Sequence, residues 1–161
     1  MGSSAPSQRA DPVGDFATFF ACRFEPCARL ALLLTGDEHL AEELAQEALT
    51  RVQPRFAELD DPDAYTRVVV VNLVRKHFRR EARRNSAEKR TLTPVVVAPE
   101  HRELLDVVAA LPLRQRSVIV LRYYEGLSEA EIAAALGCRQ GTVKSLAARA
   151  LERLRREVGD R

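Results

Sequence analysis

The 161-residue chain is poor in residues that mark several classes of protein. It contains no tryptophan, one methionine and three cysteines, and aromatic residues make up 6% of it. The cysteines, Cys22, Cys27 and Cys138, are odd in number and form no Cys-x-x-Cys pair, which argues against a disulfide scaffold. This usage predicts a cytoplasmic protein. Buried thiols are the commoner state of such cysteines, so we expect no metal site and favour burial over a redox switch.

Long hydrophobic runs are also missing. The longest apolar stretches, such as residues 68–74, fall far short of the roughly 20 residues that a membrane-spanning helix needs. The start of the sequence lacks a basic region followed by an apolar core, so we expect no secretory signal. No nucleophile, paired base or phosphate-cradling glycine loop is arranged for catalysis. The sequence therefore predicts a protein that is not an enzyme and has no cofactor.

The net charge of the whole chain is small, but the net charges of individual segments are large. The 25 basic and 23 acidic side chains leave only +2. Residues 36–63 hold nine acidic and two basic side chains, a local net charge of −7, whereas residues 64–90 carry +7 and residues 112–161 carry +4. The basic blocks suit DNA, and the acidic block would repel DNA and suits a protein partner. Without further information, a solvated helix face is the simpler interpretation of the acidic block.

Apolar residues recur at three- and four-residue steps through most of the chain, which predicts amphipathic helices. A loose tail is expected over residues 1–14 and a flexible linker over residues 82–100, where the periodicity is lost. The predicted fold is all-α, with two small helical bundles over residues 15–81 and 101–161 joined by the linker. Bundles of this size are marginally stable alone, so we expect a partner to stabilise at least one of them.

Helix boundaries are marked by capping residues and prolines. Asp and Ser side chains accept hydrogen bonds from the first N–H groups of a helix, and proline interrupts a helix interior. These residues predict N-caps at Asp37 and Asp61 and a capping box of Ser128 with Glu131. They also predict a break or a kink at Pro26 and at Pro54.

Residues 128–149 have the spacing of a helix-turn-helix, in which a capped helix, a short turn with Gly137 and a longer second helix follow one another. The second helix of this motif lies in the major groove, with its first turns at the base edges. Its apolar arc would pack inward, and the opposite side is polar and cationic. An amphipathic helix whose solvent face happens to be basic is the structural alternative.

The predicted helix over residues 62–80 also has a divided surface. Val70 and Val74 define an apolar side, and Asn72 with four cations occupies the opposite arc. Tyr65 continues that arc toward the start of the helix. An aromatic surface that leads into cations suits single-stranded or melted nucleic acid. A buried helix with a solvated basic end explains the spacing equally well.

Taken together, these motifs resemble the extracytoplasmic-function sigma factors of the bacterial sigma-70 family. The resemblance spans about residues 15–81 and 101–156, and rests on residues 39–49 (HLAEELAQEAL), 62–73 (PDAYTRVVVVNL), 123–133 (YYEGLSEAEIA) and 136–145 (LGCRQGTVKS). It implies a specificity subunit that binds core RNA polymerase and directs it to promoter DNA. Residues 15–81 would be sigma region 2 and residues 101–161 sigma region 4.

The resemblance also implies roles for individual residues. Docking on the polymerase clamp helices would use Glu42, Glu43, Leu44, Gln46 and Glu47. The −10 element would be opened and held by Tyr65, Asn72, Arg75, Lys76, Arg79 and Arg80. The −35 element would be read by Arg139, Gln140, Thr142, Lys144, Ser145 and Arg149. Region 4 would also meet the polymerase flap, and an anti-sigma factor is implied as a regulatory partner.

Two departures from the family pattern stand out. The family often has arginine where this chain has Leu146, which implies the loss of a phosphate or base contact, and it often carries tryptophan in the acidic and −10 helices. The family's promoter sequences therefore do not transfer to this chain. The alternative function is a stand-alone helix-turn-helix repressor or activator, which would need neither an acidic docking helix nor the helix of Asn72.

Overall fold

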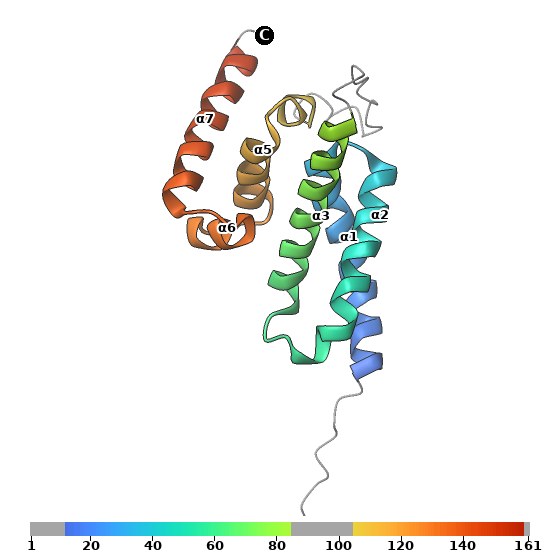
Figure 1. Ribbon diagram of the computed structural model, residues 1–161. Coiled ribbons are helices and arrows are strands. Elements are labelled where there is room, and N and C mark those ends of the chain that lie inside the picture. The colour runs from blue at the N-terminus through green and yellow to red at the C-terminus, as the bar shows by residue number, and fades with distance from the viewer. Residues whose placement is uncertain (1–11, 85–104, 160–161) are drawn as a thin grey trace, which may run out of the picture.

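The computed structural model describes residues 12–84 and 105–159, and within them the chain is helical and has no strand, which confirms the all-α prediction. In order along the chain, its helices are α1 (Pro12–Thr35), α2 (Glu38–Val52), α3 (Pro62–Arg84), α5 (Leu113–Ile119), α6 (Glu129–Leu136) and α7 (Gln140–Gly159). A 3-10 segment, η1 (Gln53–Glu58), follows α2, and a π-helical segment, η2 (Val120–Tyr124), follows α5. In Figure 1, α1, α2 and α3 stand together, and α5, α6 and α7 lie beside α3.

The first helix is longer than its sequence predicts. Of the break or kink predicted at Pro26, the break does not occur, because Pro26 lies inside α1. Proline removes one intrahelical hydrogen bond, but its fixed φ is itself helical. Cys27, Leu30 and Leu34 follow Pro26 and are buried in the core, so packing holds this part of the helix in place.

The predicted caps of the first half are confirmed. Gly36 has φ 73° and ends α1, a left-handed conformation that glycine adopts without strain. The carboxylate of Asp37 accepts from the N–H of Leu40 at 3.0 Å, and that of Asp61 accepts from the N–H of Ala64 at 2.9 Å. These side chains satisfy donors that α2 and α3 leave unpaired at their first turns.

The helix-turn-helix forms as predicted. The Ser128 Oγ accepts from the N–H of Glu131 at 3.2 Å, and the Glu131 carboxylate accepts from the N–H of Ser128 at 2.8 Å, which completes the capping box. Gly137 ends α6 with φ 62°. The π-helical segment η2, which precedes the helix-turn-helix, was not predicted. In it, the N–H of Glu125 donates to the carbonyl of Val120 at 3.2 Å, a step of five residues.

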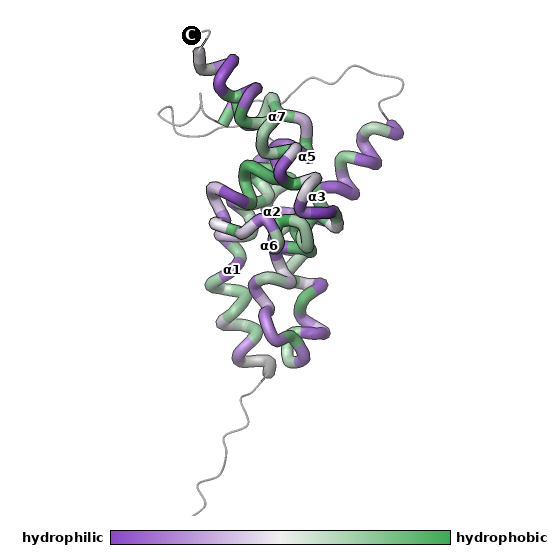
Figure 2. The backbone as a smooth tube through the Cα atoms, turned by 90° about the vertical axis from the view of Figure 1, so that its left-hand side faces the viewer, coloured by the Kyte–Doolittle hydropathy of each residue, from purple (hydrophilic) through white to green (hydrophobic). Residues whose placement is uncertain are grey.

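The two halves of the chain share one continuous core. Side chains from both halves belong to the same buried cluster. Members with exposed fractions of only 0–1% come from each half, and among them are Leu30, Leu34, Val70, Val74, Val118, Leu121, Ile132 and Val143. Figure 2 shows hydrophobic and hydrophilic residues alternating along the helices, as amphipathic packing requires. The partner that each small bundle needs is, in this structure, the other half of the chain.

Candidate nucleic-acid and polymerase interfaces

The exposed face of α2 is acidic. Its inner face is filled by small and aliphatic side chains such as Ala45, Ala48 and Leu49, which are fully buried. The remaining positions therefore face solvent, and they hold four of the five predicted docking residues: Glu42, Glu43, Gln46 and Glu47. The Nε2 of His39 lies 3.5 Å from a carboxylate oxygen of Glu43, and Arg51 pairs with Glu47. These partners are fewer than the carboxylates, so the face retains a negative excess.

Leu44 does not belong to this acidic face. It is 6% exposed and packs into the shared core, because it falls on the same stripe of α2 as Ala41 and Ala48. The resemblance placed Leu44 among contact residues, and the structure corrects this: its side chain supports the helix from within.

The second half of α3 presents a cationic surface. Asn72, Lys76, Arg79 and Arg80 are exposed, while Val70, Val71 and Val74 are buried on the opposite side. This division follows the predicted wheel. Arg75 differs from its neighbours, because it is half-buried and its Nη1 donates to the main-chain carbonyl of Leu136 in α6 at 3.0 Å.

Tyr65 is held at the start of α3 by a residue that sequence reasoning missed. The Nη1 of Arg55 donates to the Tyr65 hydroxyl at 3.3 Å, and the guanidinium carbon lies 5.4 Å from the ring centroid. Arg55 lies on η1, outside any helix that the periodicity predicts. Its position therefore depends on how η1 packs on α1, where the ring centroid of Phe56 lies 5.4 Å from that of Phe16 and 5.0 Å from that of Phe19.

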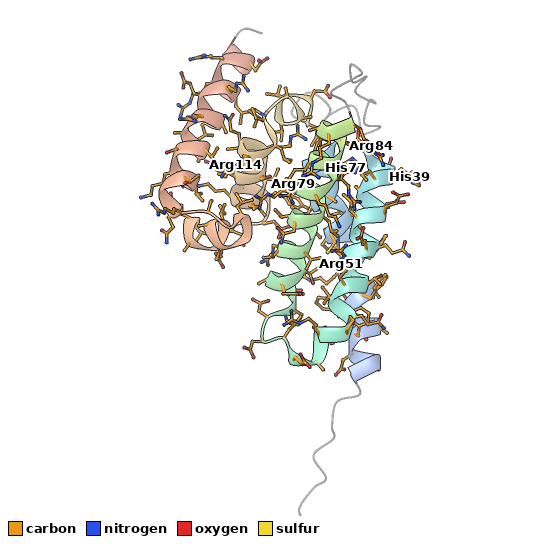
Figure 3. All side chains as sticks on the ribbon, viewed as in Figure 1. His39, Arg51, His77, Arg79, Arg84 and Arg114 are labelled. Atoms are coloured by element: carbon orange, nitrogen blue, oxygen red, sulfur yellow. The ribbon has the colours of Figure 1, made fainter. Side chains whose placement is uncertain are left out.

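A groove of about 300 Å³ lies where α3 meets α5 and α6. Its walls are Phe78, Ala82, Leu113 and Leu136, and its polar lining is Arg75, Arg79, Arg114 and Ser117. Figure 3 shows Arg79 and Arg114 near the junction of the two halves. Arg114 thus extends the cationic surface of α3 into the second half, which no periodicity within one helix could reveal.

The recognition helix α7 directs its predicted reading residues outward. Arg139, Gln140, Lys144, Ser145 and Arg149 are exposed, and Thr142 is half-buried. Lys144 Nζ lies 3.7 Å from a carboxylate oxygen of Glu129, and Ser145 Oγ donates to the carbonyl of Gly141 at 3.0 Å. Five of the six predicted −35 residues therefore lie at or just before the start of α7, where the helix dipole favours phosphate, and Arg149 lies about one turn beyond Ser145.

Leu146 lies on the inner side of α7. It is 9% exposed and packs with Val143 and Ala147 in the shared core. A buried leucine here offers no group to DNA, so the expected loss of a phosphate or base contact at this position stays a prediction. The side chain at this position contributes to packing of the helix-turn-helix.

The cysteines are unpaired thiols in different environments. Cys22 is exposed, Cys138 is half-buried and Cys27 is buried. Burial raises the pKa of the Cys27 thiol to about 11, so the thiol is protonated at neutral pH and unsuited to nucleophilic or metal-binding chemistry. In the described ranges, 12–84 and 105–159, no group of three His, Cys, Asp or Glu side chains is placed to hold a metal ion. In the same ranges, no helix combines the length and the apolar character required to cross a membrane.

Known protein families match both halves of the chain. The family described as sigma-70 region 2 matches residues 26–84, and the family described as sigma-70, region 4 matches residues 101–154. The RNA polymerase sigma-E factor of Streptomyces coelicolor is 38% identical over 89% of this chain and 86% of its own length. The ECF RNA polymerase sigma factor SigL of Mycobacterium tuberculosis is 35% identical over 81% and 83%, respectively.

Solved structures share the fold. The sigma factor RpoE from Bartonella quintana, in complex with the anti-sigma factor NepR, has a TM-score of 0.79 at 22% identity over 90% of this chain and 97% of that one. CnrH, in complex with the cytosolic domain of CnrY, has a TM-score of 0.67 at 23% identity over 92% and 90%. The region 2 match contains the acidic and α3 surfaces, and the region 4 match contains the helix-turn-helix. The chain belongs to the sigma-70 family of RNA polymerase sigma factors, in its extracytoplasmic-function class.

Proposed function

We propose that this chain docks on core RNA polymerase through α2, opens and holds the −10 element through α3, and reads the −35 element through α7. As a sigma factor of this class, it is an alternative sigma factor that directs transcription initiation. The observation that carries the assignment of surfaces is the separation of charge. One face of α2 is acidic, whereas the exposed sides of α3 and α7 are basic, and all three belong to one chain.

The α2 surface would meet the clamp helices of the polymerase. Glu42, Glu43, Gln46 and Glu47 share one exposed face, and their carboxylates would repel DNA. An acidic face of this kind is complementary to a basic protein surface, where it raises the association rate and suppresses wrong partners. Region 4 would meet the flap through Tyr123 and Tyr124, which are 62% and 45% exposed, because exposed aromatic side chains often anchor protein interfaces.

The α3 surface would hold the melted non-template strand. Tyr65 offers a ring on which an unpaired base can stack, and Asn72 offers an amide that can bond to a base edge. Arg75, Lys76, Arg79 and Arg80 would follow the phosphates of the same strand. Each phosphate that a cation neutralises releases counterions, so this binding should weaken as the salt concentration rises.

The α7 surface would enter the major groove at the −35 element. The exposed residues at its start include donors and acceptors for base edges, such as Gln140, and cations for guanine or phosphate, such as Lys144 and Arg149. Their position on the first turns of the second helix is the one that a helix-turn-helix brings to the bases.

The assignment extends to organisation and partners. The sequence predicts region 2 over residues 15–81, a linker over 82–100 and region 4 over 101–161, after a tail over residues 1–14. Because α1 begins at Pro12 and α3 continues to Arg84, we extend region 2 to residues 12–84 and shorten the tail and the linker accordingly. The protein would act without catalysis of its own, in the cytoplasm where polymerase and chromosome are. An anti-sigma factor is a further expected partner, in keeping with the complexes of RpoE with NepR and of CnrH with CnrY. A stand-alone repressor is disfavoured, because it would have no use for region 2.

Run-off transcription with purified core polymerase tests the proposal. The full chain is added to core enzyme with promoter fragments from its own genome. We expect a stable complex with core and transcripts that depend on the chain. Absence of both core binding and chain-dependent transcripts would overturn the assignment. Sequence-specific binding to duplex DNA that needs no core polymerase would instead support the stand-alone repressor.

A further inference from the structure

Three charged side chains from three elements meet at the start of the helix-turn-helix. Glu129 is the first residue of α6, Arg122 belongs to η2 and Lys144 belongs to α7. The Oε1 of Glu129 lies 3.8 Å from the Nη1 of Arg122, and its Oε2 lies 3.7 Å from the Nζ of Lys144. The Glu129 carboxylate therefore binds one cation on each oxygen, and one of the two is a predicted −35 reading residue.

The Glu129 carboxylate is the least exposed member of this group. Its side chain is 28% exposed, compared with 38% for Arg122 and 67% for Lys144. The main chain beside it is held by the capping box of Ser128 with Glu131. The side chain of Lys144, by contrast, is a flexible four-carbon stem that ends in a compact charge. The ion pair therefore restricts the ammonium of Lys144 more than it restricts the carboxylate.

Lys144 differs in this respect from the other cations of the −35 surface. In the part of the chain that the structure describes, neither Arg139 nor Arg149 pairs with a carboxylate. The next ion pair along α7 joins Arg156 to Glu152, which lies about 12 Å beyond Lys144 along the helix axis. Because an exposed ion pair contributes little to stability, a carboxylate at one reading residue matters more for binding than for the fold.

The ammonium of Lys144 has two kinds of acceptor on DNA. It can bind the O6 and N7 atoms of guanine, which report the sequence, or a backbone phosphate, which does not. The first helix of a helix-turn-helix crosses the DNA backbone, so Glu129, at the start of α6, would lie on the side of the phosphates. A carboxylate there repels phosphates and offsets the attraction that Lys144 has for them. General attraction to DNA is thereby reduced, whereas contact of Lys144 with a base edge is retained.

We propose that Glu129 is a specificity-determining residue of the −35 surface. It holds the ammonium of Lys144 between α6 and α7 and keeps phosphates from capturing it, so that Lys144 distinguishes base pairs instead of binding all DNA alike. This role rests on the proposed function, because it requires that α7 reads duplex DNA.

Binding to a pool of short duplexes with randomised centres tests the role of Glu129 in the full-length chain. Mobility shift gives the affinity for the unselected pool and its dependence on salt, and sequencing of the shifted duplexes gives the base preferences. Glu129→Gln removes the charge and retains the shape of the side chain. Glu152→Gln makes the same change within an ion pair of α7 that lies away from Lys144, so it is the matched control.

Glu129→Gln should bind the unselected pool about three- to tenfold more tightly than Glu152→Gln does, with a salt dependence steeper by about one on a log–log scale. Enrichment of the preferred base pair should fall about threefold or more, at the same position at which Lys144→Ala loses its preference. In the Lys144→Ala background, Glu129→Gln should leave the base preferences unchanged. A glutamate in a first turn also interacts favourably with the helix dipole, but that structural role does not require Lys144.

Equal base preferences in Glu129→Gln and Glu152→Gln would overturn the role of Glu129, whatever their affinities. A change of preference that persists in the Lys144→Ala background would also overturn it, because Glu129 would then act without Lys144. Circular dichroism melting checks that each variant is folded, and Glu129→Asp, which keeps the charge but shortens the reach to Lys144, should lose base preference as well. An unaltered chain with no base preference would contradict the proposed function. A chain that selects a sequence and is indifferent to Glu129→Gln would contradict this inference alone.

Discussion

The guanidinium of Arg55 lies over the ring of Tyr65 and donates a hydrogen bond to its hydroxyl at 3.3 Å. The two side chains are ten residues apart and belong to different elements, η1 and α3. A cation over an aromatic face stabilises the ring's position by about 0.5–1 kcal/mol at an exposed site. Arg55 thus orients the one aromatic side chain that we place at the −10 element.

Replacement of Arg55 by alanine should weaken the binding of melted promoter DNA. Tyr65 would lose its orienting partner, so part of the stacking energy would be spent on ordering the ring. We expect about a two- to fivefold loss of affinity for a single-stranded −10 oligonucleotide. Arg55→Lys should recover part of this loss, and Arg51→Ala on the neighbouring helix end serves as a control for the charge. Equal losses in Arg55→Ala and Arg51→Ala would contradict a specific role for Arg55.

The −35 assignment predicts a selective defect. Lys144 and Arg149 are exposed on the outward side of α7, and their replacement by alanine should remove two contacts worth about 1–3 kcal/mol each. Affinity for a −35 duplex should fall by at least about 30-fold, while binding to core polymerase is unchanged. Electrophoretic mobility shift and core pull-down measure the two properties. Arg156→Ala, near the far end of α7, is the matched control, and loss of core binding would mean that α7 is misassigned.

The docking assignment predicts the opposite pattern. Reversal of Glu43 and Glu47 to lysine should weaken association with core polymerase at least tenfold, mainly through a slower association rate, because like charges would then face each other. Binding of the −35 duplex should be retained. Surface plasmon resonance on immobilised core enzyme measures both rates. Glu58→Lys controls for net charge, and an affinity equal to that control would contradict docking through α2.

Much of the fold could be predicted because its signals are local. Asp37 and Ser128 bond to N–H groups three residues away, so a short stretch of sequence contains both partners of each cap. The burial of Val70 and the exposure of Asn72 follow from the period of a single helix. The predicted break at Pro26 does not occur, because contacts with distant residues, rather than local propensity, hold α1 together.

The contact between the halves had no comparable signal. Arg116 donates to the carbonyl of Leu34, which is 82 positions away. Arg67 pairs with Glu125, which is 58 positions away. From the sequence alone, Arg116, Arg67 and Glu125 cannot be distinguished from the exposed charged side chains around them. The burial of Leu146 beside Val143 and Ala147 likewise depends on the packing of α7 in the shared core. Residues whose partners are remote in sequence are the ones that required the structure.

The capping box makes the helix-turn-helix sensitive to acid. Hydrogen bonds from Ser128 hold the pKa of Glu131 below its ordinary value. A carboxyl group whose pKa is lower in the folded state stabilises the fold above its unfolded pKa, about 4.3, and this contribution is lost as pH falls through the folded value. The melting temperature of the unaltered chain should therefore fall more steeply below pH 4.5 than that of Glu131→Gln. Ser128→Ala should cost about 1 kcal/mol at neutral pH, because the N-cap acceptor is lost. Parallel pH profiles for the unaltered chain and Glu131→Gln would show that Glu131 does not couple protonation to folding of this half.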